Sequence, residues 1–146
     1  MNRVLLKTIE KHYAIDTGFR TINTNLINYE DTFFLENIIY NELNARGYNV
    51  DVGVVPIASR ENGKLSVRQH EIDFVINLGS KKVYIQSAFS LDGVGKKEQE
   101  TLSLRKSGDF FRKIVVVGGM KKLTRDEMGI EYVGVIPFLM DRSILL

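Results

Sequence analysis

Apolar side chains recur at helical spacing between residues 33 and 45. They lie three or four positions apart, as the 3.6-residue period of an amphipathic helix requires. The residues that set this spacing are Phe34, Leu35, Ile38, Ile39 and Leu43. Asp31 or Thr32 can cap the first turn, and Gly47 stands where a glycine commonly ends a helix. The pattern predicts one helix that begins near residue 31 and ends before Gly47.

Past this helix, the apolar residues change from helical spacing to alternation. Residues 48–57 are rich in β-branched side chains at alternating positions, which is typical of a strand. Residues 67–78 and 83–89 predict two more strands, and turns containing Gly63 and Gly79 separate the three. Consecutive strands joined by short turns predict an antiparallel meander.

The C-terminal part of the chain predicts two more strands and a helix. A helix is expected over residues 96–106 after a glycine-containing loop. Residues 113–117 are wholly apolar, as in a strand that is buried on both faces. A last strand is expected over residues 131–136, followed by a short helix or turn near residues 138–140.

The N-terminal residues 1–30 predict little regular structure and form a lead-in to the first helix. Residues 13–15 could form a short strand, and residues 16–18 carry a turn signal. With the elements downstream, the sequence predicts a single α/β domain over residues 1–146, with a mixed central sheet flanked by helices.

Composition supports a self-sufficient core and excludes several classes of protein. Hydrophobic residues make up 44% of the 146-residue chain, enough for a core without metal or disulfide cross-links. The chain contains no cysteine, which excludes a disulfide scaffold and any cysteine-ligated zinc site. No apolar run approaches the roughly 18 residues of a membrane span. We therefore expect a cytoplasmic protein with no membrane partner.

Positive charge is concentrated between residues 96 and 125. This segment holds nine basic residues against three acidic ones, although the whole chain has a formal net charge of only +2. Such a segment can contact phosphate backbones, which makes DNA a candidate partner. A solvated surface explains the same pattern and is favoured on charge alone. Phe110 and Phe111, in the middle of the segment, are expected in the core rather than as a platform for stacking bases.

Acidic and amide side chains stand at corresponding places in the first helix and two neighbouring strands. Glu36 lies on the helix, Glu71 and Asp73 on one strand, and Gln86 on the next. Strand alternation predicts that Glu71 and Asp73 share a face, with Ile72 and Phe74 on the other face. Oxygen ligands that converge in this way suit Mg²⁺ or Mn²⁺, which can activate water and polarise a phosphate. Asp73, Gln86 and Glu36 are the candidate ligands, and Glu71 is a weaker one.

Three of these residues also have a structural interpretation. Glu36 could be a surface residue that the helix dipole favours near the helix N-terminus. Glu71 could be an exposed neighbour at the entry of its strand. Gln86 could make a hydrogen bond within a buried strand face, an alternative as well supported as metal ligation.

The order of these residues resembles that of PD-(D/E)XK nucleases, including Holliday-junction resolvases. The shared features are a helix with a glutamate, Gly47-Tyr48, a strand with Asp73, and a further strand. A closer resemblance is to the C-terminal domain of prokaryotic P-loop ATPases, a nuclease-like domain of unknown function. The stretches that carry it are residues 5–20, 35–55, 70–88 and 112–117.

The resemblance implies a restriction-endonuclease-like core and an ATPase module upstream of this chain. The sequence contains no GxxxxGK[ST] motif, so this chain is not expected to hydrolyse ATP itself. It is expected to be a C-terminal region separated from that module.

The chain departs from the nuclease pattern on the strand that should read Asp/Glu-x-Lys. It reads Gln86-Ser87-Ala88 there, so a neutral amide replaces the acid and alanine replaces the lysine. Losing one such stabilising group typically lowers a rate by ~10²–10³. Lys96 or Lys97, on the next predicted helix, is a candidate substitute for the missing cation.

Two functions follow from this departure. In the first, a degenerate nuclease-like domain recognises a substrate, nucleic acid or partner for the ATPase. In the alternative, the domain is an active Mg²⁺- or Mn²⁺-dependent DNA nuclease with a relocated lysine, and Glu36, Asp73 and Gln86 are its catalytic residues.

Overall fold

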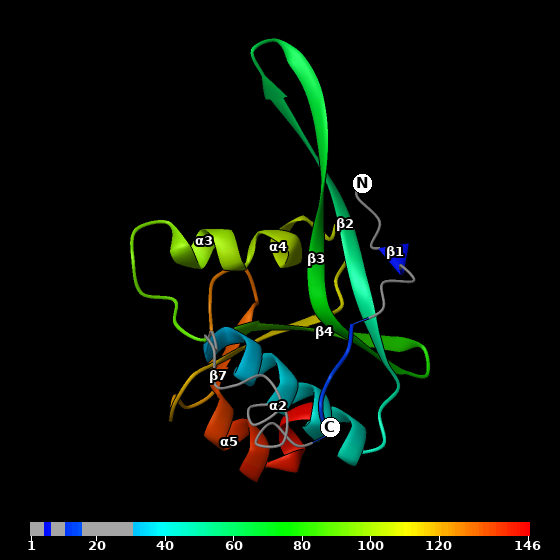
Figure 1. Ribbon diagram of the computed structural model, residues 1–146, viewed down its shortest axis with the longest axis vertical. Coiled ribbons are helices and arrows are strands. Elements are labelled where there is room, and N and C mark those ends of the chain that lie inside the picture. Colours follow the sequence, from blue (N-terminus) through cyan, green and yellow to red (C-terminus); the bar gives the residue numbers. More distant parts are fainter. Residues whose placement is uncertain (1–4, 7–10, 16–30) are drawn as a thin grey trace.

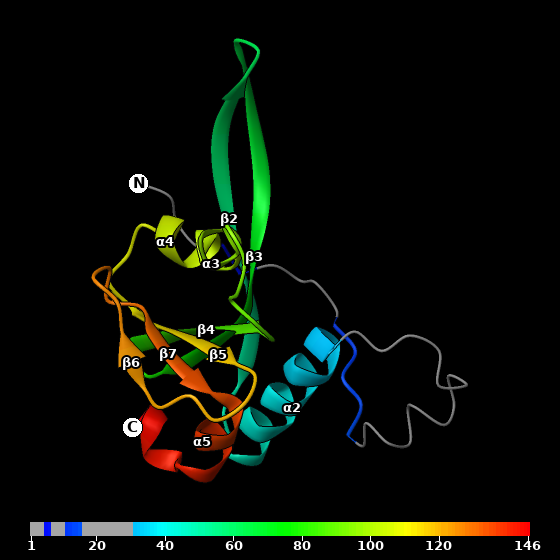
Figure 2. The same ribbon diagram turned by 90° about the vertical axis from the view of Figure 1, so that its left-hand side faces the viewer.

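A computed structural model describes residues 5–6, 11–15 and 31–146 and has one mixed sheet at its centre. The seven strands found in these residues lie in the order β1-β2-β3-β4-β5-β7-β6. Their bounds are β1 Leu5–Leu6, β2 Val50–Glu61, β3 Lys64–Leu78, β4 Lys81–Ala88, β5 Arg112–Val117, β6 Thr124–Arg125 and β7 Glu131–Gly134. Helices cover both faces of this sheet (Figures 1 and 2). The predicted α/β class is confirmed.

Strand directions divide the sheet into an antiparallel and a parallel half. β2, β3 and β4 form the predicted antiparallel meander. β5 and β7 continue the sheet parallel to β4, and β6 pairs antiparallel with β7 at the edge. β2 and β3 are longer than predicted, so their hairpin extends beyond the body of the domain (Figure 1). Asn62 and Gly63 form its tip with φ values of 51° and 78°.

Helix α2, Asp31–Ala45, packs on one face of the sheet. Its buried Leu35, Ile39 and Leu43 join a cluster that also contains residues from β3, β4, β5 and β7. Two C-terminal elements close this face beside α2, namely α5, Val135–Met140, and the 3₁₀ helix η1, Arg142–Leu145 (Figure 2). The predicted cap is confirmed, because Gly47 has a φ of 83° and the Tyr48 N–H donates to the Leu43 carbonyl.

The other face carries two short helices where one helix over residues 96–106 is expected. They are α3, Lys96–Glu100, and α4, Leu102–Lys106. The chain breaks between them at Thr101, whose φ of −98° and ψ of 1° leave the helical region. Thr101 is fully buried and its hydroxyl donates to the Lys97 carbonyl at 2.7 Å. Tertiary packing therefore divides a segment that has helical propensity throughout.

Two other predictions at the ends of elements are wrong. β7 ends at Gly134, because residues 135 and 136 already belong to α5 rather than to the predicted strand. Residues 13–15 form no strand, since their polar groups bond to α2 instead of to a neighbouring strand. The turn expected at residues 16–18 lies outside the described residues.

The sequence predicts no membrane-spanning segment, and this prediction concerns how long and how apolar the helices are. Among the described residues, no helix has the length and apolar character needed to cross a bilayer.

Candidate functional site

A β-bulge in β3 decides which way Asp73 faces. The β2–β3 register shifts between Asp51 and Gly53, so that two residues of β3, Asp73 and Phe74, lie opposite the one residue between them. A bulge bends a strand and re-aims its side chains. Here Asp73 and Phe74 both reach the α2 face.

The packing of the neighbouring residues agrees with this bulge. Phe74 belongs to the cluster under α2, whereas Ile72 and Val75 belong to the cluster under α4. The prediction that Ile72 and Phe74 share the face opposite Asp73 is therefore wrong. Regular alternation would have turned Asp73 away from α2 and Glu36.

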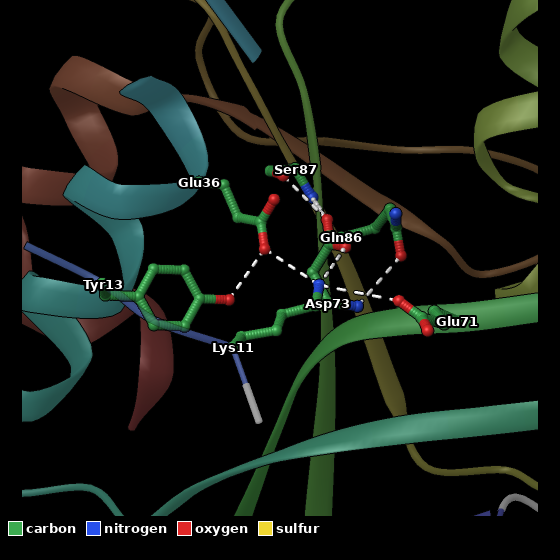
Figure 3. A network of polar contacts seen from close by, with 7 residues as sticks. All are labelled: Lys11, Tyr13, Glu36, Glu71, Asp73, Gln86 and Ser87. Atoms are coloured by element: carbon green, nitrogen blue, oxygen red, sulfur yellow. Dashed lines mark hydrogen bonds and ion pairs between the residues drawn. The ribbon is translucent and has the colours of Figure 1, made fainter. Parts of the chain in front are cut away.

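The cation at the acidic site is Lys11, which comes from the N-terminal segment (Figure 3). Its ammonium lies 2.9 Å from Glu36 Oε1, 3.4 Å from Asp73 Oδ1 and 3.8 Å from Glu71 Oε2. The Lys11 side chain is only 20% exposed, so solvent screens these contacts less than it screens an ordinary surface ion pair. The predicted acidic residues Glu36, Asp73 and Glu71 are thus brought together around one ammonium group.

Residues 11–15 are held against α2 by direct polar and aromatic contacts. Asn37, which is buried, accepts from the Ala14 N–H at 2.8 Å and donates to the Ala14 carbonyl at 2.7 Å. The Tyr13 ring stacks on Tyr40 with centroids 3.9 Å apart. The Tyr13 hydroxyl donates to Glu36 Oε1 at 2.7 Å, beside the Lys11 contact. These contacts hold Lys11 in the acidic site.

Ser87, rather than Gln86, is the β4 residue that contacts the Asp73 carboxylate. Asp73 Oδ2 accepts hydrogen bonds from the Ser87 amide at 2.9 Å and from the Ser87 hydroxyl at 2.7 Å. The Gln86 side-chain oxygen instead accepts from the Asp73 backbone N–H at 3.3 Å. Of the two interpretations of Gln86, the structure therefore supports the structural hydrogen bond.

The pKa values of the site reflect burial and charge in opposition. Burial and the charge of Glu36 raise the pKa of Asp73 above its ordinary value, against the lowering effects of Lys11 and Ser87. Burial alone would lower the pKa of Lys11, but the charges of Asp73, Glu36 and Glu71 raise it overall. The pKa of Tyr13 is also raised, by burial and by its bond to Glu36. Both Lys11 and Tyr13 therefore stay protonated near neutral pH.

Replacing Ser87 with alanine tests the hydrogen bond that its hydroxyl donates to the Asp73 carboxylate. The Ser87→Ala variant loses one buried hydrogen bond to a charged group, so we expect the free energy of unfolding to fall by about 2 kcal/mol. The pKa of Asp73 should rise further, because the Ser87 hydroxyl stabilises its charged form. Denaturant unfolding and an NMR titration of the Asp73 carboxyl measure the two effects. An unchanged or lower pKa would contradict the assigned bond.

The lysines expected to substitute for the missing cation lie elsewhere. Lys97 places its ammonium 3.8 Å from Asp126 Oδ2 and 4.6 Å from the ring centre of Tyr132. Lys96 is exposed at the start of α3. Neither is among the contacts of Asp73, so Lys11 takes the place that the sequence analysis assigned to them.

Lys11, Tyr13 and Ser87 were not predicted as site residues. Lys11 is 62 positions from Asp73 in the sequence, and the segment around it has no clear periodicity. Ser87 is the middle residue of Gln86-Ser87-Ala88, and the Asp/Glu-x-Lys motif specifies only the two outer positions. The bonds between buried Asn37 and Ala14 and the Tyr13–Tyr40 stack are long-range contacts, which no local sequence pattern predicts.

The residues at the site do not fit a divalent metal ion. Asp73 Oδ1 faces Lys11, and Oδ2 already accepts two hydrogen bonds from Ser87. The Gln86 oxygen is bonded to the Asp73 N–H. Within the described part of the chain, no three His, Cys, Asp or Glu side chains form a group that could hold a metal. The three carboxylates instead surround the ammonium group of the Lys11 side chain.

Comparison with known proteins finds similarity to a longer bacterial protein. The chain is 34% identical over 137 residues to a protein of Haemophilus influenzae (strain ATCC 51907 / DSM 11121 / KW20 / Rd) that is described as an uncharacterized protein. The match covers 92% of this chain and 30% of the Haemophilus protein, so the chain spans about a third of that relative's length. No family model and no solved structure matches the chain.

Proposed function

We propose that this chain is a catalytically silent, nuclease-like domain that serves recognition within a prokaryotic P-loop ATPase. The observation that carries the proposal is the position of the Lys11 ammonium, within 3.8 Å of the carboxylates of Glu36, Asp73 and Glu71. A partly buried ammonium with these partners compensates the acidic residues without a metal ion. The domain then keeps the acidic positions of a nuclease for stability rather than for catalysis.

The order of the elements supports the nuclease-like part of the proposal. A helix with Glu36 precedes a three-strand meander with Asp73 and Ser87, and two short helices lead to the parallel strand β5. The acidic helix residue and the Asp strand meet at one place in space, as the resemblance to PD-(D/E)XK nucleases implies.

The link to an ATPase rests on the resemblance and on the length of the relative. The match covers only 30% of the Haemophilus protein, which is consistent with a domain inside a longer chain. In this proposal the ATPase module lies upstream, and the domain works in the cytoplasm, where ATP is available. Its task there is to recognise a substrate, nucleic acid or partner.

Metal binding and DNA cleavage test the proposal together. The purified domain is expected to show no heat of binding on titration with Mn²⁺ and to leave plasmid and branched DNA intact. The Lys11→Ala variant removes the ammonium and frees the carboxylates, so Mn²⁺ should raise its melting temperature. The matched control is Lys11→Ala/Asp73→Asn, which should lose this response. Mn²⁺ binding by the wild-type domain would contradict the proposal.

A second candidate, an active nuclease with a relocated lysine, is favoured by the same ammonium. Lys11 supplies a cation beside Asp73 although the motif position is Ala88. This alternative requires Mn²⁺ to displace the Lys11 ammonium from the carboxylates, and it predicts that the wild-type domain cleaves DNA in Mn²⁺ and that Lys11→Ala abolishes cleavage. Intact DNA with both proteins would exclude it.

A further inference from the structure

Two adjoining cavities lie at the edge of the sheet where β4 and β5 begin. One has a volume of about 580 Å³ and the other about 370 Å³. Phe110, Phe111, Arg112 and Leu146 line both of them, so the two cavities adjoin at these residues, and their combined lining is called the concave surface below. Ser87 lies six positions after Lys81 on β4, about 20 Å at strand spacing, so this surface is distinct from the Lys11 site.

The side chains around these cavities carry a surplus of positive charge. Within the described part of the chain, six basic residues line them against two acidic residues, Asp109 and Glu131. The basic residues are Lys81, Lys82, Arg105, Arg112, Lys113 and Arg125. Glu131 is shared by two arginines, with Arg112 at 2.8 Å and Arg125 at 2.6 Å, so one carboxylate faces two guanidinium groups. Among the described residues, the smaller cavity is lined by basic side chains and by no acidic one.

Phe110 stands fully exposed between the two cavities. Its relative exposure is 104%, so the prediction that it belongs to the core is wrong. Phe111 does pack inward, with its ring edge-on to Tyr84 at 5.9 Å. A fully exposed aromatic ring has both faces available for stacking on a base.

The loop that presents Phe110 is fixed by hydrogen bonds to Asp109. The Tyr84 hydroxyl donates to Asp109 Oδ2 at 2.8 Å, and the Ser107 hydroxyl and Phe111 N–H both donate to Oδ1 at 3.3 Å. Lys113 adds a bond to the Asp109 carbonyl at 2.7 Å. The backbone that carries Phe110 is thus fixed before any partner arrives, which reduces the entropy lost on binding.

We propose that this concave surface binds single-stranded nucleic acid, with a base stacked on Phe110 and phosphates against the surrounding lysines and arginines. A positively charged groove combined with an exposed aromatic ring is the arrangement by which proteins hold single strands without reading their sequence. A duplex keeps its bases stacked inside the helix, where Phe110 cannot reach their faces. The proposal goes beyond the function proposed above and does not depend on the state of the Lys11 site.

Fluorescence anisotropy with a labelled oligothymidylate of about 12 nucleotides, a typical length for such grooves, tests the proposal. The wild-type domain should bind it at low salt and bind a duplex of equal length more weakly. Phe110→Ala should weaken binding about tenfold, within the range for loss of one base–aromatic stack. The matched control is Phe89→Ala, which removes a half-exposed ring from a different cavity and should bind as the wild type does.

The salt dependence of binding tests the phosphate contacts separately. The Lys81→Gln/Lys82→Gln variant should lower the slope of log affinity against log salt by about 1.4, from two lost single-strand phosphate contacts. Lys96→Gln/Lys122→Gln removes the same charge from exposed positions outside both cavities and should keep the wild-type slope.

Three results would overturn the proposal. They are absence of binding at low salt, tighter binding to the duplex, and equal losses in Phe110→Ala and Phe89→Ala. Because Phe110 is exposed, its removal leaves the core unchanged, and the unfolding curve of Phe110→Ala should match that of the wild type.

Discussion

Replacing Lys11 with methionine is expected to lower the free energy of unfolding by about 3 kcal/mol, because the substitution leaves the buried Asp73 and the partly buried Glu36 without their cation. Asp73 is 9% exposed and the Glu36 side chain is 16% exposed, so water replaces little of the lost attraction. Methionine keeps most of the side-chain volume, which separates the effect of charge from that of packing. Urea unfolding measures the difference. The control is Lys64→Met at the exposed hairpin tip, which should change stability by less than about 0.5 kcal/mol.

The stability difference between wild type and Lys11→Met should also depend on pH. The pKa of Lys11 in the folded protein lies above its ordinary value of 10.5, so its contribution is fully present below pH 10.5. The contribution is lost as the pH rises through the folded-state pKa, and the two unfolding curves should approach each other there. At the acidic end, protonation of Asp73, whose pKa is raised above 3.8, relieves the unpaired charge in the variant. A difference that stays constant across both ranges would refute the ion-pair assignment.

Replacing Gly134 with alanine is expected to lower the free energy of unfolding by about 3 kcal/mol or to prevent folding, because the structure has no space for the added Cβ atom. In the Gly134→Ala variant the added carbon would lie 2.5 Å from the Gly119 carbonyl oxygen and would also overlap the Lys121 backbone nitrogen. These are backbone atoms, so no side chain can move aside. Two hydrogen bonds tie the same segments together, from Gly134 N–H to the Lys121 carbonyl at 2.7 Å and from Ile136 N–H to Gly119 at 3.2 Å.

The matched control for Gly134 is a glycine limited by backbone conformation alone. Gly63 has a φ of 78°, and no described atom lies within 4 Å of an added Cβ, so Gly63→Ala should lower the free energy of unfolding by only about 1 kcal/mol. Gly134 has an ordinary φ of −69°, which alanine adopts without strain. Thermal unfolding of both variants ranks the two effects. A smaller loss at Gly134 than at Gly63 would mean that β7 and the residue 119–121 segment are less tightly apposed.

The positive charge counted along residues 96–125 differs from the charge that the folded protein leaves unpaired there. Lys97 pairs with Asp126, Lys113 pairs with Asp109, and Arg112 and Arg125 pair with Glu131. Asp126 and Glu131 lie just beyond the segment, so a count by sequence overstates its free charge. Around Phe110, however, the fold adds Lys81 and Lys82 from β4 and concentrates positive charge in one place.

The sequence by itself determined the elements whose signals are local. The spacing of Leu35, Ile39 and Leu43 defines a helix because residues three and four apart share one face. Alternation and glycine turns define the β2–β4 meander, and an unbroken apolar run defines the buried strand β5. These features depend on residues within a few positions of each other, which is why a pattern along the chain reveals them.

Only the tertiary structure decided how the candidate site is built. The bulge that turns Asp73 toward α2 arises from the pairing of two strands, and regular alternation predicts the wrong neighbours for it. Lys11 reaches Asp73 across 62 positions, held by Asn37 and the Tyr13–Tyr40 stack. Phe110 and Phe111 are identical neighbours in the sequence, yet one is exposed and the other packs against Tyr84. In each case the outcome depends on contacts between distant segments, and these contacts exist only after the chain has folded.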